Sequence, residues 1–103
     1  MILLSFMAAC SIDRVADIEE LVGDPELGAA VYQAECGGCH GPEGEGLSGP
    51  AMADVTPLHT DSEFISIVLF GVGDTMPAHE YMSDQEIADV LAWSRQEFGE
   101  FSL

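Results

Sequence analysis

Apolar residues recur at helical spacing in three separate stretches of the chain, and no stretch alternates as a β-strand does. The residues that share one face of the first stretch are Leu27, Ala30, Val31 and Ala34. The second stretch, residues 64–70, is almost continuously apolar, which predicts burial on most sides. The inner face of the third stretch consists of Ile87, Val90, Leu91 and Phe98. The pattern predicts an all-α domain with about three main helices.

Helix-capping residues begin each of these stretches. The starting signals are Asp24 followed by Pro25, the capping box of Thr60 and Glu63, and the capping box of Ser83 and Glu86. Gly71 and Gly73 are expected to end the second helix, and Gly99 the third. Met82 and Ile87 can form a hydrophobic staple at the start of the last helix.

The segment from about residue 37 to 57 is rich in Gly and Pro and predicts a long loop. A loop of this length is uncommon in a small domain unless it surrounds something rigid. The chain has only 103 residues and a formal charge of −17, so self-repulsion opposes a small core. We therefore expect a bound cofactor that supplies apolar surface.

The charge balance excludes several classes of partner. Nineteen acidic residues face two basic ones, Arg14 and Arg95, so no basic face for nucleic acid can be assembled. Binding to anionic membrane surfaces is disfavoured for the same reason. Hydrophobic residues make up 48% of the chain, which is enough for a packed domain and argues against disorder.

The strongest chemical signal is Cys36-Gly37-Gly38-Cys39-His40. Covalent attachment of a c-type haem needs two thiols that reach the two vinyl groups and a His beside the second thiol to bind iron. The composition of the chain would produce this pattern by chance roughly 0.002 times. The spacing is therefore specific.

Three other interpretations of these cysteines remain open. A thioredoxin-like redox pair would need a βαβ context, which the pattern lacks. A zinc site would take Cys36, Cys39, His59 and His79 but would leave the position of His40 unexplained. A Cys36–Cys39 disulfide would close a very short loop and stabilise little.

Residues 24–103 resemble the small bacterial mono-haem cytochromes c with His/Met ligation, in the order helix, CxxCH, Gly-Pro loop, helix, Met-Pro and final helix. The resemblance implies the cytochrome c fold, with long loops wrapped around one covalently attached haem c and its iron. It implies that Cys36 and Cys39 form the thioethers and that His40 is the proximal ligand. It implies that Met76, which precedes a Pro, is the distal ligand of the iron.

The same resemblance extends to residues around the haem. It implies that the carbonyl of Pro50 accepts a hydrogen bond from the proximal His ring. Gly28 and Tyr32 would meet Trp93 where the first and last helices cross. Met52 is expected to be a haem-wall or loop residue. The rival distal ligands are interpreted as surface loop residues, and they are His59 and His79.

The function implied is one-electron transfer between extracytoplasmic redox partners. Two filled axial positions leave no site for a substrate, so an enzyme is not expected. The alternatives are a haem-based sensor of small ligands and a permanently bound electron-outlet subunit of a dehydrogenase or oxidase. The chain has no Lys, so the partner is expected to present a basic surface.

The N-terminal residues resemble a lipoprotein leader. Residues 1–9 are predicted to be a signal peptide that ends at a lipobox, with Cys10 lipidated, although no Lys or Arg opens it. A buried or frayed N-terminus with a lone Cys is the alternative. Residues 10–23 would form a linker or a short amphipathic helix. No apolar stretch is long enough to span a membrane, so a periplasmic protein anchored by its lipid is expected.

Overall fold

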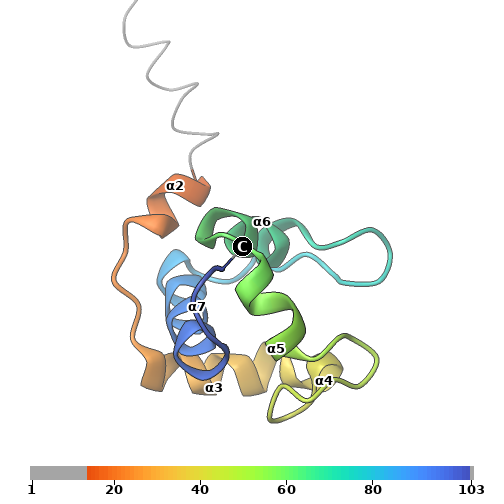
Figure 1. Cartoon of the computed structure of the whole chain (residues 1–103). Helices are drawn as coiled ribbons and strands as arrows, with labels where there is room; N and C mark the ends of the chain where they lie inside the picture. Colours follow the sequence, from red (N-terminus) through yellow and green to blue (C-terminus); the bar gives the residue numbers. More distant parts are fainter. Residues whose placement is uncertain (1–13, 103) are drawn as a thin grey trace, which may run out of the picture.

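Helices account for the regular structure of residues 14–102, the part of the chain that the computed structural model describes (Figure 1). The elements are α2 (Arg14–Glu19), α3 (Pro25–Glu35), α4 (Gly37–His40), α5 (Met52–Val55), the 3₁₀ helix η1 (Thr56–Leu58), α6 (Asp61–Phe70) and α7 (Asp84–Phe98). Across these described residues the one β feature is an isolated antiparallel bridge between Val72 and Met76. The all-α prediction with three main helices, α3, α6 and α7, is confirmed.

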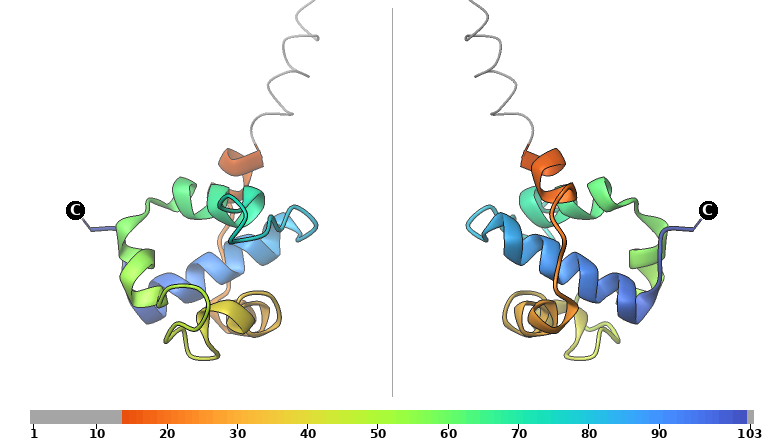
Figure 2. Two further views of the ribbon diagram at one scale, coloured as in Figure 1. Left: turned by 90° about the vertical axis from the view of Figure 1, so that its right-hand side faces the viewer. Right: turned by 90° about the vertical axis from the view of Figure 1, so that its left-hand side faces the viewer.

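Helices α3 and α7 cross closely, and Figure 2 shows α7 running across α3. A Cβ built on Gly28 would overlap the backbone carbonyl of Asp89 and lie 2.9 Å from Cβ of Trp93. The rings of Tyr32 and Trp93 pack beside this point with centroids 4.4 Å apart. The predicted crossing of a small residue with paired aromatics is therefore present.

Adding a methyl group at this crossing tests how far the fold depends on it. We expect Gly28→Ala to lower the free energy of unfolding by about 3 kcal/mol, because both helix backbones must shift to admit the Cβ. The measurement is guanidinium denaturation of the haem-loaded protein. Ala30→Ser, on the exposed face of the same helix, is the control and should cost much less. Equal stability of the two variants would contradict this account of the crossing.

The capping signals act as the sequence predicts. The side chain of Asp24 accepts hydrogen bonds from the backbone amides of Glu26 and Leu27. Complete capping boxes begin α6, at Thr60, and α7, at Ser83. These satisfied N-termini fix where the two helices that flank the Met76 segment start.

The apolar face that the sequence gives α3 is not the face that the helix buries. Leu27 is 58% exposed, and the buried residues of this helix are Gly28 and Tyr32. The reason is the close crossing with α7, which requires a glycine beside a large aromatic residue. Glycine does not register in a pattern of apolar side chains, so the aliphatic stripe indicated the wrong side.

Two further predictions need correction. The expected loop over residues 37–57 contains the short helices α4 and α5 and part of η1. Helix α6 buries Phe64, Ile65, Val68 and Leu69, yet Phe70 at its end is 60% exposed. The predicted burial on most sides therefore holds for most of residues 64–70 and fails at Phe70, the last residue of the helix.

Within residues 10–23, for which a linker or a short amphipathic helix is expected, the structure shows a short helix, α2, that packs on the domain. Ile18 of α2 is 1% exposed and belongs to the hydrophobic core, with Val15 packed against it. Nothing in the described part of the chain forms a helix that is long and apolar enough to cross a membrane. The predicted leader, residues 1–9, and Cys10 lie outside the described residues.

Candidate cofactor site

The cysteine motif occupies one tight helical turn. Helix α3 ends at Glu35, and Cys36 leads directly into α4, which carries Cys39 and His40. The amides of Cys39 and His40 both donate to the carbonyl of Cys36, at 3.2 and 3.1 Å. Positions three and four apart lie on one side of a helix, so this turn groups the two sulfurs and the imidazole. Both thiols are free.

The imidazole of His40 is oriented by the backbone of the following loop. Its Nδ1 lies 2.7 Å from the carbonyl oxygen of Pro50, which is the contact that the sequence predicted. A carbonyl can only accept, so Nδ1 carries the proton and donates. The lone pair of Nε2 is then available for a metal, and the hydrogen bond raises its basicity.

Backbone hydrogen bonds fold this loop against the motif. The amide of Gly49 donates to the carbonyl of Cys39 at 2.8 Å, and that of Gly46 donates to the carbonyl of His40 at 2.6 Å. The hydroxyl of buried Tyr32 donates to the carbonyl of Gly41 at 2.6 Å, and burial raises the pKa of Tyr32 to about 12. The position of Pro50 opposite His40 is therefore fixed from several sides.

The environment of Cys36 argues against thiol redox chemistry. Burial raises the pKa of the Cys36 thiol to about 11, and the negative charges of Glu35 and Cys39 act in the same direction. A reactive redox cysteine needs a lowered pKa, because the thiolate is the nucleophile. The thioredoxin-like alternative also lacks its strands within residues 14–102.

Met76 stands in a turn between α6 and α7 that is tied back on itself. The amide of Val72 donates to the carbonyl of Met76 at 2.9 Å, and the amide of Met76 donates to the carbonyl of Val72 at 3.1 Å. Gly71, with φ of 76°, ends α6, and a Cβ there would overlap the Met76 carbonyl. The turn therefore requires glycine at this point, and it holds the half-buried Met76 at a defined place.

Large apolar side chains are exposed on the segments around these residues. Among them are Leu47 at 65%, Leu58 at 64%, Phe70 at 60% and Val72 at 48% exposed. Each lies in the loop after α4, in η1, or where α6 meets the Met76 turn. A chain of this size gains stability if an apolar ring system covers such surface. The imidazole with a free Nε2, the paired thiols and this apolar surface fit a c-type haem.

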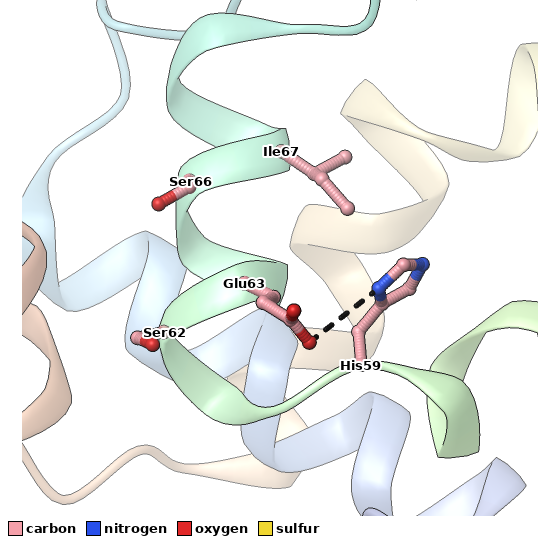
Figure 3. A pocket seen from close by; sticks show the side chains of 5 residues that line it. All are labelled: His59, Ser62, Glu63, Ser66 and Ile67. Carbon is pink, nitrogen blue, oxygen red and sulfur yellow. Dashed lines mark ion pairs between the residues drawn. The ribbon is translucent and has the colours of Figure 1, made fainter.

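A separate cavity of about 300 Å³ lies against α6 (Figure 3). Its lining residues are His59, Ser62, Glu63, Ser66 and Ile67. Nδ1 of His59 lies 3.8 Å from a carboxylate oxygen of Glu63. The backbone amide of Thr60 lowers the pKa of the Glu63 carboxyl, and His59 acts in the same direction. None of the residues of the cysteine motif lines this cavity.

The interpretation of His79 as a surface residue is wrong. His79 is only 7% exposed, and its amide donates to the carbonyls of Val68 and Leu69 at the end of α6. Its Nδ1 is buried and has no hydrogen-bond partner. Among residues 14–102, no group of three or more His, Cys, Asp or Glu side chains is placed to hold a metal ion, so the four-ligand zinc site is not assembled.

Comparison with known proteins agrees with this geometry. The features described above define a small mono-haem c-type cytochrome: the helices, the CxxCH motif, the oriented His40 and the turn that carries Met76. The chain belongs to the family described as cytochrome C oxidase, cbb3-type, subunit III, whose model matches residues 23–93. The resemblance inferred from the sequence is confirmed. The protein carries a covalently bound c-type haem with its iron and is a haem electron carrier.

Relatives of known name are cytochromes of bacteria. A cytochrome c-553-like protein of Synechocystis is 36% identical over 75% of this chain and 72% of its own length. Cytochrome c-551 of Bacillus subtilis is 36% identical over 64% of this chain and 57% of its own length. Bacterial c-type cytochromes act outside the cytoplasm, where the haem is attached.

Solved structures share the fold. Cytochrome cL of Methylophaga aminisulfidivorans superimposes with a TM-score of 0.64 at 25% identity, over 70% of this chain. Cytochrome cL of Hyphomicrobium denitrificans gives a TM-score of 0.62 at 27% identity, over 68% of this chain. The chain spans 51% and 45% of those two proteins, or about half their length.

Proposed function

We propose that this protein is an extracytoplasmic one-electron carrier whose haem is held by Cys36 and Cys39 and ligated by His40 and Met76. The observation that supports it most is the hydrogen bond from Nδ1 of His40 to Pro50, which leaves Nε2 for iron. When bound, the haem supplies an iron that alternates between ferric and ferrous states. The protein's own residues then decide how the cofactor is oriented and which partners approach it.

Each residue has a distinct task in this proposal. Addition of the two thiols to the vinyl groups would fix the ring against α4. The Pro50 carbonyl holds the imidazole in one tautomer and orientation, so that little rearrangement accompanies electron transfer. Met76 would supply a thioether to the iron, a type of ligand that favours the ferrous state and raises the potential. With both positions filled, no substrate site remains.

The distribution of charge favours a basic partner. The only two basic side chains of the chain, Arg14 and Arg95, both form ion pairs inside the molecule, with Asp84 and Asp61. Among residues 14–102, neither arginine is therefore left unpaired to offset the surface carboxylates. A complementary partner would therefore carry Lys or Arg around its own redox centre.

This partner chemistry can be tested by electron-transfer kinetics. We expect the rate constant with a basic redox partner to fall at least about tenfold between low and physiological salt, since the Debye length shrinks to about 8 Å. Stopped-flow reduction against ionic strength measures it, with a neutral small-molecule reductant as control. A rate that is flat or rises with salt would contradict the basic-partner proposal.

The haem assignment has its own test. We expect the protein, made with a haem-maturation system, to keep its reduced α-band colour in the protein fraction after acid–acetone extraction. The ferric form should show the weak far-red band of Met-ligated haem. Extraction of the colour would overturn covalent attachment, and a covalent haem without the far-red band would remove Met76 from iron.

A permanently bound oxidase subunit is the second candidate. The family description names a subunit of a cbb3-type cytochrome oxidase, which favours this alternative for residues 23–93. Co-purification from detergent-solubilised membranes would distinguish the two: a subunit stays with an oxidase at high salt, whereas a carrier separates from it. Lipidation of Cys10 would place either form at the outer face of a membrane.

A further inference from the structure

Helix α2 precedes the segment that the family model matches, yet it is integrated into the domain. The family match begins at residue 23, whereas α2 covers Arg14–Glu19. Ile18 is 1% exposed in the core that α6 and α7 build, and both views in Figure 2 show α2 beside α6. An element outside the matched segment is therefore fastened to the two helices that flank Met76.

The guanidinium of Arg14 is the polar part of this attachment. Nη1 donates to the carbonyl of Glu80 at 3.0 Å, and Nη2 donates to the carbonyl of Met82 at 2.6 Å. Nε donates to a carboxylate oxygen of Asp84 at 2.8 Å. One planar group thus binds three acceptors on a stretch of five residues, which a Lys side chain could not do.

These acceptors belong to the segment that joins Met76 to α7. Before Met76, the chain is paired with it through the backbone of Val72. After Met76, the amide of His79 donates to the carbonyls of Val68 and Leu69 in α6 at 2.9 and 3.2 Å. Arg14 fixes the far end of the same segment. The backbone that carries Met76 is therefore held before Met76 by Val72 and after it by two successive attachments, His79 on α6 and then Arg14. The Arg14 attachment comes from outside the matched family segment.

We propose that Arg14 is a positioning residue for Met76: by fastening residues 80–84 to α2, it keeps the Met76 thioether on the haem iron. This inference rests on the proposed ligand role of Met76. A thioether is a weak ligand, so the fraction of molecules with an open iron position depends on how well the loop is held. A ligand that binds only the open form has an apparent affinity set by that fraction.

The test is an imidazole titration of the ferric, haem-loaded protein, followed by loss of the far-red band. For Arg14→Gln we expect the apparent Kd for imidazole to fall about tenfold, since a charge-assisted hydrogen-bond network is lost from the closed form. Ala16→Glu makes the same change in net charge at an exposed position of α2. Ala30→Gly weakens α3 on its exposed face and lowers overall stability without touching the Met76 segment.

The inference holds if Arg14→Gln alone lowers the Kd and both controls stay near the wild type. A wild-type Kd in Arg14→Gln overturns it, and so does an equal decrease in Ala30→Gly, which would indicate general loss of stability. If Arg14→Gln gives no folded protein, Arg14→Lys replaces it. A smaller decrease is then expected, and an unchanged Kd overturns the inference.

Failure of the ligand assignment would look different. A wild-type protein without the far-red band removes Met76 from iron and overturns both the ligand role and its positioning by Arg14. If the wild-type protein shows the band but Arg14→Gln leaves the apparent Kd for imidazole unchanged, the proposed electron carrier stands and only the role of α2 is refuted.

Discussion

Replacing Met76 with alanine is expected to abolish the far-red band of the ferric protein and to lower its reduction potential by on the order of 0.1 V, a modest share of the roughly 0.8 V that axial ligands span. The thioether stabilises ferrous iron, so its loss favours the ferric form. The vacated position should also let ferrous protein bind carbon monoxide at neutral pH. Because Cys36 and Cys39 are untouched, the haem should stay covalently attached.

Met52→Leu is the matched control for this prediction. Met52 is the other described Met with a possible place near the haem, and it is buried at 7% exposure. Leucine conserves its volume, so packing should change little. A far-red band that survives Met76→Ala but disappears in Met52→Leu would reverse the assignment, and an unchanged potential in Met76→Ala would exclude Met76 from the iron.

Replacing Arg95 with glutamine is expected to lower the free energy of unfolding by about 3–5 kcal/mol, which is a large share of the about 5–15 kcal/mol typical of a domain. The Arg95 side chain is 7% exposed. It donates to the carbonyls of Thr56 and His59 at 2.7 and 2.6 Å and to Asp61 at 2.9 Å. Glutamine cannot reach all of them, so buried carbonyls lose their partners.

Asp61→Asn separates the ion pair from the carbonyl contacts. The Asp61 side chain is 52% exposed, so its charge is screened by water and its neutralisation should cost about 1 kcal/mol or less. Guanidinium denaturation of the haem-loaded protein measures both variants. If Asp61→Asn lowers the free energy of unfolding as much as Arg95→Gln does, Arg95 stabilises the protein through the ion pair and not through its hydrogen bonds to the loop carbonyls.

The sequence is sufficient to predict features that depend only on residues close together in the chain. The Asp24 cap and both capping boxes depend on residues at most three apart, and the haem motif depends on five consecutive residues. The contact between His40 and Pro50 was predicted through resemblance to a family, and no spacing rule would have produced it. These parts of the fold and of the candidate site could be predicted from the sequence.

Predictions failed where the outcome depended on packing between distant segments. The buried side of α3 is decided by α7, which begins about fifty residues after α3 ends, so the apolar face that includes Leu27 does not identify the buried side and Leu27 is 58% exposed. His79 is interpreted from the sequence as a surface loop residue, but its segment is hydrogen-bonded to the end of α6 and the side chain is buried. No periodicity within either segment carries this information.

The roles of the two arginines were also missed, although a signal existed for one of them. Arg95 lies four residues after Leu91, and therefore on the inner face of α7, where a charged residue requires partners. Nothing comparable marks Arg14, whose three acceptors follow more than sixty residues later. The role of Arg14 can be inferred only from the structure, in which α2 packs on the domain.

The attachment of α2 also limits how far a lipid-anchored form of this protein could reach. If Cys10 carries the lipid, the four peptide units from Cys10 to Arg14 extend at most about 14 Å, whereas an undocked chain as far as Asp24 would extend about 50 Å. With the shorter tether, the domain would stay in a thin layer next to the bilayer. With the longer tether, it could move through a much larger volume. Its electron donor and acceptor would have to offer their redox centres within that layer, so anchored neighbours in the same membrane would be favoured over freely diffusing proteins.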